Sequence, residues 1–217
     1  MDWSPLLISV KIAAVSTVIT FILGTIAAKA VVSMKRFKFI IDTVFSLPLV
    51  LPPTVVGFFL LILFGKNTAF GSFLYRIGIN IVFTWQGAVL AAVVVSFPIM
   101  YRTMRGAFEQ VDKDLIDMAR LFGCGRINII YKVWIPLSWP VIVSGVTLSF
   151  ARALGEFGAT IMIAGNLPGK TRTMSVAVYT AMQSGDRTLA YSWTAVILVM
   201  SAALLLVINY LTEKKYK

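Results

Sequence analysis

The stretch Asp112-Lys113-Asp114-Leu115-Ile116-Asp117-Met118-Ala119-Arg120-Leu121-Phe122-Gly123 decides the fold, because it is polar while long apolar runs lie on both sides of it. Asp112 and Asp114 are typical of a helix N-terminus, where carboxylates accept hydrogen bonds from free backbone N–H groups. Gly123 is a natural residue for ending a helix. Three apolar residues recur between these signals at helical spacing: Leu115, Met118 and Phe122. The stretch therefore predicts a short amphipathic helix.

Outside this stretch the chain is too apolar for a soluble protein. Hydrophobic residues make up 59% of its 217 residues and charged residues 13%, whereas soluble domains carry about a quarter charged residues. A helix needs about 20 mostly apolar residues to cross a bilayer. The chain provides five such segments, which we place at about 8–32, 40–65, 80–104, 136–164 and 188–211. We therefore predict an all-α integral membrane protein with five transmembrane helices in a single domain, residues 1–217.

The basic residues predict how these spans are oriented. The formal net charge is +11, and most Lys and Arg lie in the loops around residues 29–38 and 102–132 and in the tail at 214–217. Cytoplasmic loops carry such an excess of Lys and Arg. We therefore expect the N-terminus outside the cell, the C-terminus in the cytoplasm, and lipid rather than nucleic acid around the chain.

The polar loop, about residues 105–134, is longer than a plain connection between spans. A second short helix is expected over residues 126–134, before Pro136 begins the next span. Two interpretations of the amphipathic helix follow from its pattern. Its apolar face rests on lipid or on the bundle, or it inserts into a groove on a cytoplasmic partner.

The loop resembles the "EAA" loop of ABC importer permeases. In that family the loop reads Glu-Ala-Ala, three variable residues and Gly, followed about a dozen residues later by Leu-Pro. Here Asp117, Met118 and Ile135 depart from the pattern, while Ala119, Gly123 and Pro136 match it. The resemblance implies a type I ABC importer permease fold with a cytoplasmic coupling helix that docks on the ATPase. The coupling residues that it implies are Asp117, Met118, Ala119, Gly123 and Pro136.

Three further stretches resemble the permease subunit of molybdate ABC importers, and the similarity runs from about residue 4 to 212. They are Leu-Pro-Leu-Val-Leu-Pro-Pro-Thr-Val-Val-Gly at 47–57, Ser-Phe-Ala-Arg-Ala-Leu-Gly-Glu-Phe-Gly-Ala-Thr at 149–160, and Asn-Leu-Pro-Gly-Lys-Thr-Arg-Thr at 166–173. Sulfate permeases share the Phe-Ala-Arg-Ala-x-Gly-Glu core, so this core indicates only a tetrahedral oxyanion. The residues after it favour molybdate, and tungstate is a nearly identical dianion.

Proline, hydroxyl and charged residues in these spans are candidates for the transport pathway. Proline in a membrane helix frees backbone groups, which then need protein or water as partners. Arg152 and Glu156 lie four residues apart and can pair. Either they form a neutralised structural pair, or Arg152 faces the pathway and attracts a dianion while Glu156 weakens that attraction. The candidate pathway residues are Pro48, Pro52, Pro53, Thr54, Ser149, Arg152, Glu156 and Thr160, with Ser96 as a further hydroxyl.

The sequence contains little that could perform catalysis. His is absent and Cys124 is the single cysteine, so neither a metal cluster nor a His-based catalytic group is expected. Gly169-Lys170-Thr171 is not a P-loop, because position 164, where the first glycine would stand, is Ala. We therefore predict a non-catalytic subunit that binds no cofactor.

The resemblance also implies the partners. They are a second copy of the chain, two cytoplasmic ABC ATPase subunits that bind ATP and Mg, and an extracytoplasmic molybdate-binding protein. The expected location is the cell membrane of a prokaryote. The alternatives are a sulfate-type oxyanion permease and an ion-coupled secondary transporter, although the two inverted halves that mark many such transporters are not evident.

Overall fold

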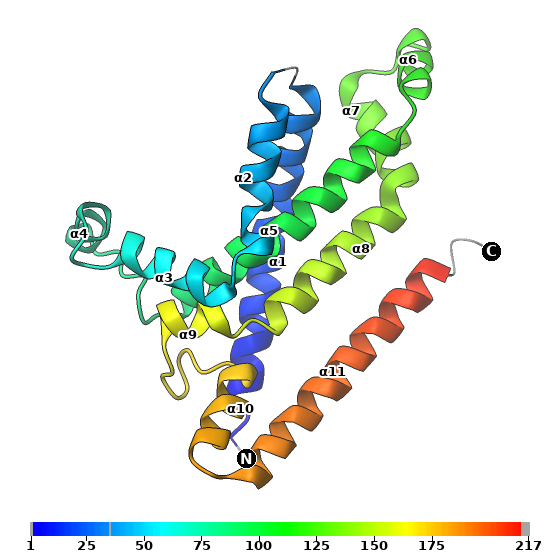
Figure 1. Cartoon of the computed structure of the whole chain (residues 1–217). Coiled ribbons are helices and arrows are strands. Elements are labelled where there is room, and N and C mark those ends of the chain that lie inside the picture. The colour runs from blue at the N-terminus through cyan, green and yellow to red at the C-terminus, as the bar shows by residue number, and fades with distance from the viewer. Residues whose placement is uncertain (1, 35, 214–217) are drawn as a thin grey trace.

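The computed structural model describes residues 2–34 and 36–213, and every regular element within them is a helix. Four long helices dominate (Figure 1): α1 (Ser4–Ser33), α5 (Trp85–Gln110), α8 (Ile135–Leu154) and α11 (Arg187–Glu213). Each contains a stretch that is long and apolar enough to cross a membrane. The chain is therefore an all-α integral membrane protein.

The predicted span over residues 40–65 is divided into two helices, α2 (Lys38–Val50) and α3 (Pro53–Phe64), which bend by 109° at their junction. Leu51 at the junction is extended, with φ −67° and ψ 138°. A residue before proline is driven to this conformation by contact with the proline ring, and Pro52 is that proline. Pro53 then starts α3, where its missing N–H costs nothing. Counted with this bent pair, the described residues contain up to five spans.

The predicted span over residues 136–164 is also divided. Helix α8 ends at Leu154, and the short helix α9 (Gly158–Ala164) follows after three residues. The polar residue Glu156 lies in this break and is almost completely buried. The remaining spans agree with the prediction to within a few residues, except that α5 begins at Trp85 and continues to Gln110, beyond the expected end at 104.

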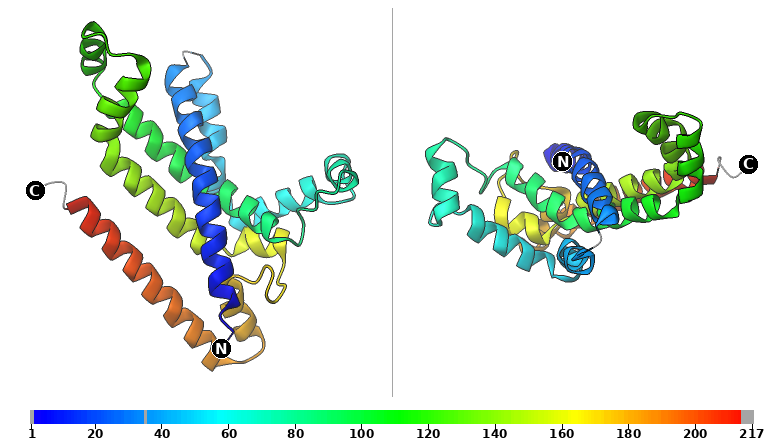
Figure 2. Two further views of the ribbon diagram at one scale, coloured as in Figure 1. Left: turned by 180° about the vertical axis from the view of Figure 1, so that it is seen from behind. Right: turned by 90° about the horizontal axis from the view of Figure 1, so that it is seen from above.

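Helices α1, α5 and α8 pack closely through small residues, as membrane helices commonly do. A Cβ added to Gly24 on α1 would lie 2.8 Å from Cγ of Met100 on α5. One added to Gly145 on α8 would lie 2.8 Å from Cγ2 of Thr103. In contrast, α11 packs mainly on α10 (Met174–Gln183) and diverges from the other helices (Figures 1 and 2).

The two ends of the bundle differ in content. The N-terminus and α10 lie at one end, while the α1–α2 turn, α6 (Lys113–Leu121) and α7 (Arg126–Ile129) lie at the other (Figure 1). A further short helix, α4 (Ala69–Arg76), follows α3. The second helix expected over residues 126–134 is α7 plus a π-helical turn, Ile130–Trp134, that runs directly into α8.

Candidate functional site

The two broken spans meet at their breaks. A Cβ added to Gly57 on α3 would lie 2.7 Å from the Cα of Ala159 on α9, a distance that side chains do not normally reach. A Cβ added to Gly158 would lie 3.0 Å from the Cβ of Pro53 and 3.1 Å from the backbone N of Thr54. The glycines therefore allow the backbones of α3 and α9 to touch. In this way the structure brings together the 47–57 and 149–160 stretches that the sequence singled out.

Arg152 and Glu156 form an ion pair at the second break. Nη1 of Arg152 lies 2.6 Å from Oε2 of Glu156. The other carboxylate oxygen, Oε1, accepts a hydrogen bond of 2.7 Å from the backbone N–H of Ala159, in the first turn of α9. The Glu156 side chain is 2% exposed and the Arg152 side chain 30% exposed. Glu156 therefore neutralises Arg152 and also caps α9, whereas Arg152 still reaches the surface of the chain.

The other pathway candidates divide by exposure. Thr54 and Pro52 are exposed, and Pro48 and Pro53 are half-buried beside the break between α2 and α3. Ser149 and Thr160 are buried, with 0% and 1% of the residue exposed. Among the described residues, Oγ of Ser149 has no hydrogen-bond partner. Pro52, Thr54 and Arg152 are thus candidates whose side chains reach the surface of the chain. The pathway role of the whole set stays a prediction.

Ser96 is a different case. Its side chain is completely buried, donates to the backbone oxygen of Ala92 at 2.6 Å, and lies 3.3 Å from Oγ1 of Thr20 on α1. This hydroxyl pair joins α1 to α5 inside the bundle. Ser96 is therefore placed to hold two helices together, and no open surface of the chain reaches it.

The predicted amphipathic helix is α6, and its ends follow the sequence signals. Asp112 is the N-cap, and its side chain accepts from the backbone N–H of Asp114 at 2.9 Å. Gly123 has φ +76°, a conformation that favours glycine. Of the other coupling residues, Asp117 pairs with Arg120 at 2.8 Å on the surface, and the backbone oxygen of Ala119 accepts from the N–H of Cys124 at 3.0 Å.

The apolar side chains of this segment point away from the rest of the chain. Leu121 is 87% exposed and Phe122 81%. Met118 and Leu115 are about half exposed, at 53% and 46%. The sequence pattern had not assigned Leu121 to this face. Only Ile116 turns inward, where it packs against the cluster that includes Met104 and Trp134. An apolar group on the far side of a short helix is typical of a helix that fits a groove on a partner.

Two contacts connect the polar segment to the spans beside it. Phe108, near the end of α5, stacks on Trp134 with ring centroids 4.1 Å apart and planes at 18°. Ser138, near the start of α8, donates to the backbone oxygen of Ala107 at 3.2 Å. The last implied coupling residue, Pro136, occupies the first turn of α8, beside these contacts. The end of α5 and the start of α8 therefore contact each other at the end of the bundle that carries α6.

Sequence reasoning missed a charged cluster between α2 and α5, formed by Lys38, Asp42, Arg105 and Glu109. Arg105 Nη1 lies 2.5 Å from Asp42 Oδ1, and its Nε lies 3.1 Å from Glu109 Oε1. Lys38 Nζ lies 3.0 Å from the same Glu109 oxygen, and Tyr101 donates its hydroxyl to Asp42 at 2.9 Å. The i, i+4 spacing of Arg105 and Glu109 is the one local signal that the sequence offers.

Metal binding finds no support in the part of the chain that the structure describes. Within those residues no group of three or more His, Cys, Asp or Glu side chains could hold an ion.

The chain also matches a known protein family along most of its length. Residues 20–214 match the family described as the binding-protein-dependent transport system inner membrane component. The chain belongs to this family.

Curated relatives of this permease include two molybdenum permeases that are similar over nearly their whole length and a sulfate permease that is similar over two thirds of its length. YvgM of Bacillus subtilis, named for a molybdenum transport system permease, is 42% identical over 98% of the chain and 93% of its own length. The molybdenum transport system permease protein ModB of Escherichia coli is 40% identical over 98% and 92%. The sulfate transport system permease protein CysT of Salmonella typhimurium is 35% identical, over 83% and 67%.

Solved structures with this fold are permeases of ABC importers. One is from the MetNI methionine ABC transporter, with a TM-score of 0.74 at 15% identity over 97% of the permease and 94% of that chain. Another is from a bacterial ABC transporter that imports alginate, with a TM-score of 0.79 at 15% identity over 99% and 79%. The fold is therefore that of an ABC importer permease.

Proposed function

We propose that this permease is the membrane subunit of an ATP-driven importer for molybdate or for the similar dianion tungstate. The observation that carries this proposal is the exposed apolar group on α6, which lies at one end of the bundle (Figure 1). The chain that carries this group is 40% identical to a molybdenum permease over 98% of its residues. A sulfate permease is the second candidate, because CysT shares 35% identity over 83% of the chain. The longer and closer similarity favours molybdate.

In this mechanism α6 is the part that receives motion from the ATPase. Leu121 and Phe122 are free to insert into a groove on a cytoplasmic ATPase subunit. That subunit binds ATP with Mg and hydrolyses it, so the permease itself needs no cofactor. Ile116 on α6 packs against the cluster that includes Trp134, and the Phe108–Trp134 stack joins this cluster to the end of α5. The ion pair between Arg105 and Asp42 then joins α5 to α2. A shift of α6 would thereby reach the break at Leu51.

The pathway in this proposal lies between two copies of the chain, each contributing the crossing of α3 and α9. Closed two-fold assemblies are the commonest form of oligomer. Arg152 is the charge on this crossing that would attract a dianion, and Glu156 keeps that attraction weak enough for release. Transport requires sites that bind weakly and transiently. An extracytoplasmic binding protein would deliver the oxyanion to the N-terminal side, and the C-terminus would lie in the cytoplasm of a prokaryote.

The test is oxyanion-stimulated ATP hydrolysis by the complete complex in liposomes, comparing molybdate, tungstate and sulfate. We expect stimulation by molybdate and tungstate but not by sulfate. Phe122→Asp should abolish stimulation, because it places a charge in an apolar contact. Phe73→Asp, at an exposed aromatic residue on α4, should not. Stimulation by sulfate alone would show that the chain is a sulfate permease. Uptake without any ATPase would support an ion-coupled transporter.

A further inference from the structure

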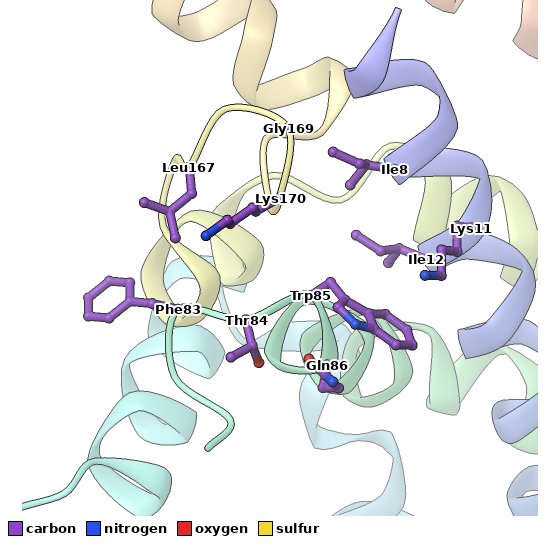
Figure 3. Close-up of a pocket in the computed structure, with 10 residues that line it drawn as sticks. All are labelled: Ile8, Lys11, Ile12, Phe83, Thr84, Trp85, Gln86, Leu167, Gly169 and Lys170. Carbon is purple, nitrogen blue, oxygen red and sulfur yellow. The ribbon is translucent and has the colours of Figure 1, made fainter. Parts of the chain in front are cut away.

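A cavity of about 480 Å³ lies toward the N-terminal end of the bundle (Figure 3). None of the described residues that line it belongs to α3 or α9. Three segments line it: the first turns of α1, the start of α5, and the loop at residues 167–170. The volume falls within the usual range of small-molecule sites, about 300–1,000 Å³. It is therefore large enough for a small ligand that keeps part of its hydration shell.

Two lysines give this cavity its charge. Lys11 and Lys170 both line it, and none of the described residues that line it is acidic. Nor does either lysine take part in the ion pairs found within the described chain. Lys11 is held over the Trp85 ring, with Nζ 4.2 Å from the ring centroid. The cavity thus carries two positive charges that form no ion pair with a carboxylate in the described part of the chain.

The start of α5 adds to the positive potential. The 26-residue helix begins at Trp85, after Thr84 as its N-cap, and both residues line the cavity. The N-terminus of a helix carries a partial positive charge and free N–H groups. Gln86, in the same first turn, provides a side-chain amide at the cavity wall. The cavity therefore combines two ammonium groups with neutral donors, which is a chemistry that suits an anion.

The loop that presents Lys170 is preformed. Thr171 is completely buried, and its Oγ1 accepts from the N–H of Leu167 at 3.0 Å. The backbone oxygen of Leu167 in turn accepts from the N–H groups of Lys170 and Thr171 at 3.1 and 2.9 Å. Figure 3 shows the Lys170 side chain extending from this loop toward the start of α5. The ammonium group is thus positioned at the cavity by a closed turn.

We propose that this cavity is an outer waiting site that binds the tetrahedral oxyanion before it enters the pathway. This inference rests on the proposed function, since it requires the N-terminal end to face the outside. Lysine suits such a site, because its strongly hydrated point charge attracts a dianion without the fixed bidentate contacts of arginine. Clefts lined by one sign of charge raise association rates by about 10–10³-fold. The site therefore concentrates the substrate without trapping it.

The experiment measures uptake of radiolabelled molybdate by the complete complex in phosphatidylcholine liposomes. Lys11→Gln with Lys170→Gln should lower kcat/KM about tenfold at low salt and leave kcat unchanged. The difference should disappear near 1 M salt, where the Debye length is about 3 Å. Lys66→Gln is the matched control, because Lys66 is also stacked on a ring, 4.1 Å from the centroid of Tyr75, but lies outside this cavity.

Direct binding separates the possible outcomes. Equilibrium dialysis of molybdate against the complex without its binding protein should show a site that the lysine substitutions remove. If the wild type takes up molybdate and the lysine variants have the same kcat/KM as the wild type, the waiting site is overturned while the proposed function stands. A different result would refute the proposed function: the wild-type complex binds molybdate and the lysine variants do not, but the wild-type complex takes up no molybdate.

A lipid headgroup is a second source of anion that could occupy the cavity, and the lipid composition of the liposomes tests for it. If lipid phosphate occupies the cavity, the effect of the substitutions will appear only in liposomes with phosphatidylglycerol, and molybdate dialysis will be unaffected. That result would overturn the proposal, as would a reduced affinity for the binding protein with unchanged molybdate binding. Should the double variant fail to assemble, Lys170→Gln alone gives the test, because Lys170 is exposed on its loop.

Discussion

Replacing Glu156 tests whether the ion pair at the α8–α9 break is structural. Glu156→Ala removes the cap on Ala159, which costs about 0.5–2 kcal/mol at a helix N-terminus. It also leaves Arg152 without its carboxylate. An unpaired arginine costs about 2.5–3.5 kcal/mol at the centre of a membrane helix, which is an upper bound for the partly exposed Arg152 at the end of α8. The sum is at most about 5.5 kcal/mol. Glu156→Gln keeps the cap, because the amide oxygen still accepts, and should lose only the second contribution.

Thermal unfolding of the purified permease in detergent measures these differences. A loss of about 5.5 kcal/mol corresponds to roughly 11–22 °C in Tm for a chain of this size, and this range is the upper limit expected for Glu156→Ala. The double variant Arg152→Gln with Glu156→Gln keeps the cap and carries no charge, so its Tm should lie within a few degrees of wild type. Equal losses for Glu156→Ala and Glu156→Gln would refute the capping role. A double variant as unstable as Glu156→Gln would refute the cost assigned to an unpaired arginine.

The same double variant distinguishes the two roles of Arg152. If the pair is only structural, the neutral variant should assemble and transport normally. If Arg152 faces the pathway, the variant should assemble but take up molybdate at least tenfold more slowly, because the charge that attracts the dianion is gone. Assembly is measured by size-exclusion chromatography of the complex, and uptake in liposomes.

Three further predictions concern a close backbone contact, a helix end and an ion pair between helices. Gly57→Ala should destabilise the permease by about 1–3 kcal/mol, because its Cβ would lie 2.7 Å from the backbone of Ala159, whereas Gly106→Ala, with nothing within 4 Å, should not lower the Tm. Gly123→Val should reduce coupled ATP hydrolysis far more than Gly123→Asn, because φ is +76° and Asn tolerates this region better than a β-branched residue; equal losses would contradict a conformational cause. Arg105→Gln should leave binding of the ATPase intact but lower oxyanion stimulation, and unchanged stimulation would show that its bond to Asp42 transmits nothing.

Local signals in the sequence were sufficient for α6. The cap at Asp112 and the positive φ at Gly123 depend only on neighbouring residues, so the helix could be placed without the fold. The long spans followed from length and apolar composition for the same reason. The family agrees with the resemblance that the sequence motifs indicated. The close meeting of the 47–57 and 149–160 stretches was not predicted and comes from the structure alone.

Contacts between residues far apart in the sequence could not be predicted from the sequence. The ion pairs between α2 and α5 join Asp42 to Arg105, and nothing in either segment indicates the other. The burial of Ser96 depends on the facing hydroxyl of Thr20 in the same way. The breaks at Leu51 and Gly155 were missed because apolar composition continues across them, while proline and the capping carboxylate interrupt the helix.

The second break changes what the Arg152–Glu156 pair means. In a continuous helix both charges would lie deep within a span, and each would have to be neutralised by the other. In the structure Arg152 occupies the last turn of α8, where the helix dipole is negative, and Glu156 caps the positive start of α9. Each charge is thus stabilised by a helix end as well as by its partner. The break therefore allows an arginine to remain partly exposed in the membrane region, which is the condition that attraction of a dianion requires.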